Sequence, residues 1–226
     1  MIAWYSGRNF IRTYLERDVP QFGPRIPAQT LERLWIMLAH NQAGLLNASR
    51  LAAGLSVSAP TVTSYVDLLA DLLLVRLLPP FHANTGKRLV KSPKIYVRDS
   101  GIVHALLGIE DLNDLSGHPV VGPSWEGYII ENLLSVAPTR TIASFYRTTA
   151  GAEIDLLLTP PGKRPWAIEI KRTLAPKVEK GFYLACEDIN PERRLIVYPG
   201  TESFPLKVGV EVMSLYALAK ALGELA

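Results

Sequence analysis

Two apolar segments near the middle of the chain contain charged residues that could do chemistry. Asp155 stands in the segment AEIDLLL, and Glu169 and Lys171 stand in the segment AIEIK. Side chains alternate between the two faces of a strand, so Glu169 shares a face with Lys171, and Asp155 shares one with Glu153. The intervening TPPGKRP is compact and rich in turn formers. We therefore predict two antiparallel neighbouring strands whose acidic faces meet on one side of a sheet.

A third carboxylate precedes these strands on a predicted helix, SWEGYIIENLL. Glu126 is spaced three, four and seven residues from Ile129, Ile130 and Leu133, so it lies on the same helical face. This spacing predicts that Glu126 points toward the sheet. Glu131 falls on a different face, and we expect it to be solvated.

Together these positions predict a metal site with Glu126, Asp155 and Glu169 as ligands and Lys171 beside them. Three carboxylates alone would raise one another's pKa values, and Mg²⁺ or Mn²⁺ removes that repulsion. Such a cation stabilises charge on a phosphodiester and helps to generate a hydroxide, while Lys171 would orient or deprotonate the water or neutralise developing charge. Two alternatives remain open: a solvated strand face with an ion pair, and a site that has decayed or that serves only to bind.

The first half of the chain is predicted to be helical. Residues 9–18 form a helix in an N-terminal arm, residues 1–28, which ends at the proline-rich VPQFGPRIP. LERLWIMLA then has the spacing of an amphipathic helix, and a short helix follows at about 49–54. A third helix is capped by Ser58. Its expected buried positions are Val62, Tyr65, Val66, Leu69, Leu72 and Leu73.

Three helices with a tight glycine-containing turn between the second and third predict a helix-turn-helix. Two extended pieces around Gly86 and Pro93 would form a hairpin, which makes residues 29–120 a winged helix. Beyond a loop rich in turn formers, residues 121–226 are predicted to form a helix, three strands, a second helix, a fourth strand, a short extended piece and a last helix. The fold class is therefore α/β, a winged helix-turn-helix followed by a mixed α/β domain.

The predicted winged helix is a candidate DNA-binding element. Its hairpin carries five cations suited to phosphate contacts, Lys87, Arg88, Lys91, Lys94 and Arg98. Its third helix carries hydroxyls but no Lys or Arg, so base reading would be weak; these are Thr61, Thr63 and Ser64. The alternatives are a solvated surface or a surface that contacts a partner ATPase module.

Composition narrows the functional classes. The chain has 226 residues, a net charge of +3 and one cysteine, Cys186, so no intrachain disulfide or cysteine-rich zinc site is expected. Cys186 is expected to be a small buried apolar group. No GxxxxGK[ST] phosphate cradle is present, which predicts no ATPase activity in these residues. The low cysteine content fits a reducing, cytoplasmic setting. No apolar segment suits a signal peptide or a membrane span.

The order Glu126, Asp155, Glu169-Ile170-Lys171 resembles the PD-(D/E)xK nuclease superfamily, which has the restriction-endonuclease-like fold. One departure is visible, because Ile154 stands where the motif has proline. The resemblance implies that residues 121–226 form a nuclease-like domain with a Mg²⁺ or Mn²⁺ site.

A second resemblance covers nearly the whole chain. The segments YLERDV, LVRLLPPFHANTGKRLVKSPKIYVRDSG, WEGYIIENLL, FYRTTAGAEIDLLL and AIEIK are similar to the C-terminal region of a prokaryotic family of AAA-type ATPases. In that family an ATPase module precedes a winged helix and a nuclease-like domain. The resemblance implies an ATPase context, supplied by a separate polypeptide or by a longer form of the chain.

These observations lead to two functional hypotheses. The first is a DNA-binding module of an AAA-type ATPase system that hydrolyses phosphodiesters with Mg²⁺. The second is a non-catalytic module that binds DNA or protein and regulates a partner ATPase.

Overall fold

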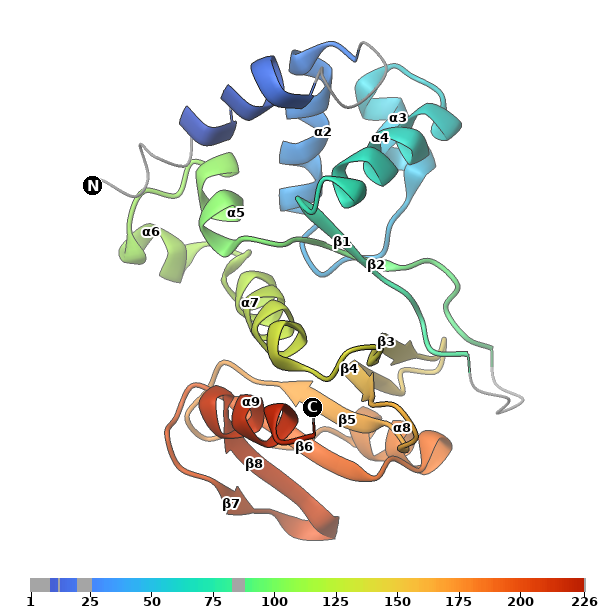
Figure 1. Ribbon diagram of the computed structural model, residues 1–226, viewed down its shortest axis with the longest axis vertical. Helices are drawn as coiled ribbons and strands as arrows, with labels where there is room; N and C mark the ends of the chain where they lie inside the picture. Colours follow the sequence, from blue (N-terminus) through green and yellow to red (C-terminus); the bar gives the residue numbers. More distant parts are fainter. Residues whose placement is uncertain (1–8, 12, 20–25, 83–87, 226) are drawn as a thin grey trace. The chain divides into compact units, whose positions relative to one another are not determined.

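The computed structural model shows a mixed α/β protein (Figure 1). It describes residues 9–11, 13–19, 26–82 and 88–225. Within these residues, no helix has both the length and the apolar character needed to cross a membrane. Cys186 is a free, fully buried cysteine, as expected, and burial raises the pKa of its thiol to about 12. A thiol with that pKa is not a nucleophile at neutral pH.

The chain divides into two compact units. The first unit contains Met1–Leu77 and Lys94–Tyr128, and the second contains Leu78–Pro93 and Ile129–Ala226. The predicted boundary near residue 120 precedes helix α7, whereas the units divide within that helix. The segment from Leu78 to Pro93, which we expected to belong to a wing, is part of the second unit.

The first unit consists of helices and a two-stranded sheet. Its elements are η1 (Tyr14–Asp18), α2 (Ala28–His40), α3 (Ala48–Leu55), α4 (Ala59–Asp71), β1 (Val75–Leu78), β2 (Lys94–Val97), α5 (Ser100–Leu106) and α6 (Leu112–Gly117), with the division between the units falling at the last residue of β1. Asn47 accepts a hydrogen bond from Arg50 N at the start of α3, and Ser58 accepts one from Thr61 N at the start of α4. These caps satisfy backbone donors that a helix leaves unpaired in its first turn.

The three helices and the two-stranded sheet agree with the predicted element types, but two details were wrong. Helix α4 ends at Asp71, and Leu73 has a φ of 58° and is 68% exposed instead of buried. The extended piece predicted around Pro93 corresponds to strand β2, which begins at Lys94, but its partner is Val75–Leu78, for which no strand was predicted. Gly86, the other predicted strand position, lies outside the described residues.

The second unit is built on a six-stranded sheet in the order β3-β4-β5-β6-β8-β7. The strands are β3 (Ile142–Arg147), β4 (Glu153–Thr159), β5 (Trp166–Ile170), β6 (Arg193–Tyr198), β7 (Phe204–Pro205) and β8 (Val210–Ser214). The remaining elements are α7 (Val121–Val136), which carries the division, α8 (Lys180–Ile189), η3 (Lys207–Gly209) and α9 (Leu215–Gly223). Strands β4 and β5 are antiparallel neighbours, as predicted, and β5, β6 and β8 are parallel.

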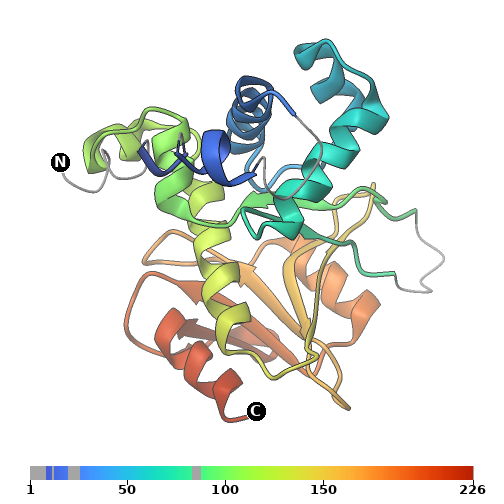
Figure 2. The same cartoon turned by 45° about the horizontal axis from the view of Figure 1, so that its top comes forward.

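Helix α8 packs on the sheet and defines the face that matters for the candidate site. In Figure 2 it lies alongside the strands, and it contacts β4. Phe182, Ala185 and Cys186 of this helix share one apolar cluster with Ala167 of β5 and Ile196 of β6. Glu169 is two residues beyond Ala167 and lies opposite Ile196, so it belongs to this same face.

Candidate functional site

Asp155 stands at an irregularity in strand β4. The register between β3 and β4 shifts between Ser144 and Tyr146, where two residues of β4, Asp155 and Leu156, lie opposite the single residue Phe145. This is a β-bulge, which interrupts the alternation of faces and redirects side chains. The strict alternation that we assumed for β4 therefore does not hold at the position of the aspartate.

The carboxylate of Asp155 is held at the end of strand β5. The ladder between β4 and β5 runs as far as the pair Leu156–Ile168, and Asp155 and Glu169 are the next residues on the two strands. Asp155 Oδ2 accepts a hydrogen bond of 2.9 Å from Ile170 N. The structure therefore brings Asp155 next to the backbone that carries Glu169, as the sequence predicted for two adjacent antiparallel strands.

Lys171 lies between two carboxylates. Its Nζ is 2.9 Å from Glu169 Oε1 and 2.8 Å from Glu179 Oε1. The Glu169 side chain is 10% exposed, that of Lys171 is 20% exposed, and that of Glu179 is 74% exposed. The lysine thus joins a buried carboxylate on the sheet to a carboxylate at the surface.

Burial and pairing shift the pKa values of these three groups in different directions. Burial raises the pKa of Glu169 above its ordinary value, because hydrogen bonding to Lys171 offsets only part of the desolvation. Burial alone would lower the pKa of Lys171, but its hydrogen bonds to Glu179 and Glu169 outweigh burial and raise it. The hydrogen bond from Lys171 lowers the pKa of Glu179. Lys171 is therefore held as an ammonium.

A further acid, Glu153, and its partner Arg147 lie at the same end of the sheet. The charge of Glu153 acts on Glu169, and Glu153 Oε2 is 3.5 Å from Arg147 Nε. The segment containing Arg88 runs beside this strand end, because Thr149 N donates to Arg88 O at 3.1 Å and Val90 N donates to Arg147 O at 3.1 Å. At this strand end, Arg147 pairs with the carboxylate of Glu153, and the backbone of Arg88 lies beside β3.

Glu126 has a different environment from the one predicted. It belongs to the first unit, where its Oε1 accepts hydrogen bonds from Lys94 Nζ at 3.2 Å and from Tyr96 Oη at 2.5 Å. Asp155, Glu169 and Lys171 all belong to the second unit. Glu126 therefore forms a structural ion pair with Lys94 and a hydrogen bond with Tyr96. The role of Glu126 as a metal ligand stays a prediction.

The donor set can be compared with the needs of Mg²⁺. In the part of the chain that the structure describes, no group of three or more His, Cys, Asp or Glu side chains is arranged to hold a metal ion. Mg²⁺ in phosphate-handling sites is commonly held by one or two carboxylates, with water and substrate phosphate completing the shell. Asp155 and Glu169 supply two hard oxygen donors on adjacent strands, which fits that kind of site.

The predicted DNA contacts are distributed over both units. The prediction that Lys94 contacts phosphate is wrong, because Lys94 is 3% exposed and its ammonium donates a hydrogen bond to Glu126. Arg88 and Lys91 are exposed and belong to the second unit, and Arg98 is partly exposed in the first. Lys87 lies outside the described residues.

The three hydroxyl residues lie on α4, as predicted, with Thr61 partly exposed and the other two exposed. The Thr61 hydroxyl is 2.7 Å from the Ser58 hydroxyl, and the hydroxyls of Thr63 and Ser64 donate to carbonyls of the same helix, those of Ala59 and Pro60. These hydroxyls would have to exchange such local bonds for contacts with bases.

Sequence reasoning missed Glu179 and the bonding partners of Glu126. Glu179 precedes α8 in a segment without regular structure, so neither strand nor helix periodicity indicates its direction. Tyr96 and Lys94 are 30 and 32 residues from Glu126 in the chain. One sequence feature could have indicated the Glu126–Lys94 pair. Strand Lys94–Val97 is buried throughout, and a lysine at the start of a buried strand needs an anionic partner.

Comparison with known proteins divides the chain in a similar way. Residues 2–113 match the family model described as Domain of unknown function (DUF8612), and residues 121–218 match Domain of unknown function (DUF4143). The chain is 45% identical over 204 residues to uncharacterized proteins of Mycobacterium bovis and Mycobacterium tuberculosis. The alignment covers 90% of this chain and 45% of each relative, so the chain spans about half the length of the curated relatives it matches. No solved structure matches the chain.

Proposed function

We propose that the second unit hydrolyses phosphodiester bonds of DNA in the presence of Mg²⁺ or Mn²⁺. The observation that carries the proposal is the arrangement of a bulge aspartate, Asp155, beside a buried glutamate, Glu169, whose strand continues into Lys171. It agrees with the resemblance to PD-(D/E)xK nucleases. In this proposal, the second unit has a restriction-endonuclease-like fold.

The residues divide the chemistry among them. Asp155 and Glu169 would hold the cation, which would stabilise charge on the phosphate and favour ionisation of a water. Lys171 is hydrogen-bonded to two carboxylates and acts as a donor, so it neutralises negative charge and orients oxygen atoms and does not remove a proton. Of the roles that the sequence left open for Lys171, this proposal keeps orientation and charge neutralisation and drops deprotonation of the water.

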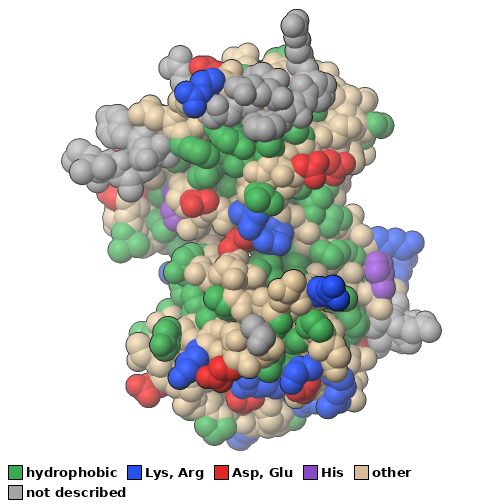
Figure 3. All heavy atoms as spheres, in the orientation of Figure 1, with side chains coloured by type: hydrophobic (Ala, Val, Ile, Leu, Met, Phe, Trp, Pro, Cys, Tyr) green, Lys and Arg blue, Asp and Glu red, His purple; other side chains and the backbone are tan. Residues whose placement is uncertain are grey.

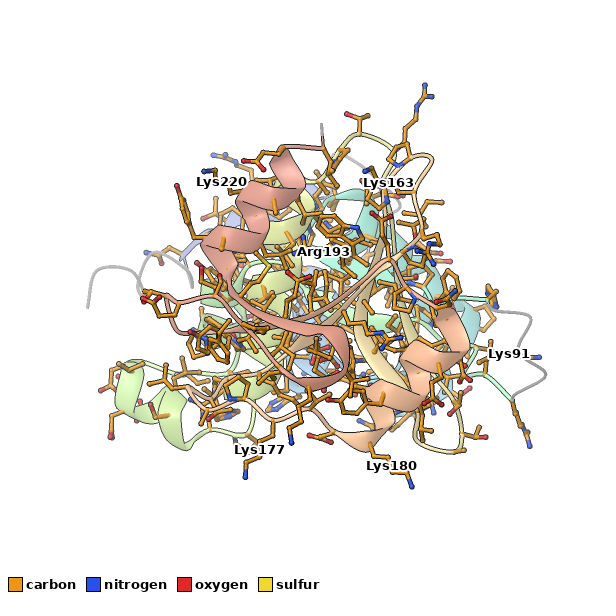
Figure 4. The ribbon with its side chains drawn as sticks, turned by 90° about the horizontal axis from the view of Figure 1, so that it is seen from below. Lys91, Lys163, Lys177, Lys180, Arg193 and Lys220 are labelled. Carbon is orange, nitrogen blue, oxygen red and sulfur yellow. The ribbon has the colours of Figure 1, made fainter. Side chains whose placement is uncertain are left out.

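The charge distribution supports DNA contact by the second unit. Its sequence contains fifteen Lys and Arg against eleven Asp and Glu, whereas the first unit contains nine against ten. Figure 3 shows Lys and Arg side chains interspersed with acids over the face of the second unit that it draws. Arg88 and Lys91 are exposed beside strand β3, and Figure 4 shows Lys91 extending away from the ribbon. Such cations give sequence-independent affinity for phosphates.

The first unit would have a winged-helix role in this proposal. Three helices followed by a two-stranded sheet support that interpretation, and α4 would be the helix that approaches DNA or a partner. The resemblance to the C-terminal region of AAA-type ATPases supports an ATPase module as partner and a cytoplasmic location.

A test of the proposal compares two variants of the whole chain. Supercoiled plasmid is incubated with Mg²⁺ or Mn²⁺ and with wild type, Asp155→Asn or Glu187→Gln. Glu187 is an exposed acid on α8 and provides the matched loss of one charge. We expect nicking by wild type and Glu187→Gln and its loss in Asp155→Asn. Equal activity of the two variants would reject the assignment.

A second candidate function is non-catalytic binding that regulates a partner ATPase. The engagement of Glu126 with Lys94 and Tyr96 favours it, because this carboxylate already satisfies a buried cation. Salt-dependent DNA affinity without cleavage in either metal would support this alternative. Loss of both affinity and cleavage would favour a protein-binding role.

A further inference from the structure

The two carboxylates that hold Lys171 are unequal. Glu169 is on the sheet and nearly buried, whereas Glu179 is 74% exposed. An exposed ion pair contributes little to stability and is readily broken, because water competes for both charges. Glu179 is therefore the partner of Lys171 that is easier to replace.

The position of Glu179 shows that its side chain serves Lys171 and not its own helix. Glu179 is the N-cap residue of α8, yet its side chain accepts no capping hydrogen bond from the described residues of that helix. It extends instead to Lys171 Nζ at 2.8 Å. Glutamate is not one of the residues that commonly cap a helix with their side chains, so this carboxylate is available to a partner outside the helix.

We infer that Glu179 is a positioning residue that occupies the place of a substrate phosphate at Lys171 and is exchanged for that phosphate when DNA binds. The inference rests on the proposed function. Carboxylate and phosphate are both anionic oxygen acceptors, and a lysine ammonium binds either one as a compact charge. Glu169 would keep its contact with Lys171 during the exchange, because it is fixed on strand β5.

The neighbours of Glu179 are suited to such an exchange. Lys177 and Lys180 are exposed and flank it in the chain, and Figure 4 shows both side chains extending away from the ribbon. Their charges attract a phosphate backbone toward this surface. They also provide cations near a Glu179 side chain that has left Lys171. Asp155, Glu153 and Glu169 oppose the approach of DNA, so the exchange depends on these cations and on Lys171.

The experiment measures DNA binding without cleavage. A fluorescein-labelled duplex oligonucleotide is titrated with the whole chain in EDTA, using wild type, Glu179→Gln and Glu187→Gln. Both variants remove one negative charge from the region of α8, so general electrostatics affects them alike. We expect Glu179→Gln to bind roughly twofold to fivefold more tightly than Glu187→Gln, the range for one exposed ion pair. Equal dissociation constants would overturn the inference.

Lys171→Met provides the second comparison. In that background the Glu179→Gln and Glu187→Gln substitutions should have equal effects, because the group that discriminates them is gone. A difference that persists without Lys171 would overturn the inference. Thermal unfolding of each variant shows whether it is folded, and the comparison of the two single glutamine variants stands if Lys171→Met does not fold.

Cleavage kinetics separate this inference from the proposed function. If the chain cleaves DNA, Glu179→Gln should lower KM by a similar factor and leave kcat within about twofold, because the exchange affects substrate binding. Absence of cleavage by wild type would reject the nuclease function, while the binding titration would still decide the role of Glu179. Absence of DNA binding by every variant would overturn the inference itself.

Discussion

The Glu126–Lys94 pair gives a prediction that separates a structural role from a metal-binding role. Lys94 has a side chain only 4% exposed, and its ammonium is 3.2 Å from a carboxylate that is 19% exposed. Glu126→Gln keeps the shape and an acceptor for Tyr96 but removes the charge that faces the buried ammonium. Removing one partner of a buried pair costs about 3–5 kcal/mol.

We expect a smaller cost for Glu126→Gln, about 2–3 kcal/mol, because Glu126 is partly solvated and the amide oxygen still accepts a hydrogen bond. For a protein of this size 1 kcal/mol shifts the midpoint of thermal unfolding by about 2–4 °C, so the first unit should melt about 4–12 °C lower. Thermal unfolding followed by tryptophan fluorescence can detect this, since Trp35 is fully buried in the first unit.

Two further variants control the measurement. Asp67→Asn removes an exposed acid from α4 in the same unit and should change stability by less than about 0.5 kcal/mol. Lys94→Met combined with Glu126→Gln removes both charges and should recover much of the loss, because no buried charge is left without its counter-charge. Unchanged stability of Glu126→Gln, or a double variant less stable than the single one, would refute the structural role. A metal-ligand role instead predicts loss of cleavage at unchanged stability.

Three other predictions concern the second unit. Lys171→Met should reduce cleavage by about 100-fold or more, because the charge that neutralises the phosphate is lost, whereas Lys220→Met, which removes an exposed lysine of α9, should retain cleavage within about threefold; plasmid nicking measures both. Burial raises the native pKa of Glu169, so above about pH 4.5 native wild type holds a proton that the unfolded chain releases, and wild type loses stability as the pH rises. Glu169→Gln has no such proton, so its stability should increase relative to that of wild type over the same range. Urea unfolding between pH 4 and pH 8 tests the sign. Gly181→Ala should cost about 1–3 kcal/mol, since a Cβ would lie 2.6 Å from Gly151 O; the measure is the urea midpoint, and an unchanged midpoint would contradict it.

Local patterns in the sequence were sufficient for most elements. Asn47 and Ser58 cap helices α3 and α4, because a short polar side chain before an apolar-periodic segment satisfies first-turn donors wherever the helix packs. The compact TPPGKRP linker likewise predicted that β4 and β5 are antiparallel neighbours, which the structure confirms. The helical prediction went wrong at Leu73, where apolar spacing continued beyond the end of α4.

The candidate site was predictable only in part. The adjacency of Asp155 and the Glu169 strand follows from strand order and a short connection, both of which are local. The bulge at Asp155 depends on how β3 pairs with β4, and no residue pattern within β4 predicts the bulge. Glu179 reaches Lys171 from an irregular segment, where side-chain direction has no period.

The sequence by itself determined which elements form and which two strands carry the aspartate and the Glu169–Lys171 pair, because capping, periodicity and short turns act over a few residues. Tertiary structure decided which charge pairs with which: Glu126 with Lys94, Lys171 with both Glu169 and Glu179, and the 78–93 segment with the second unit. The physical reason is that the strength of a charge pair depends on distance and desolvation. Both quantities are set only when distant segments pack together.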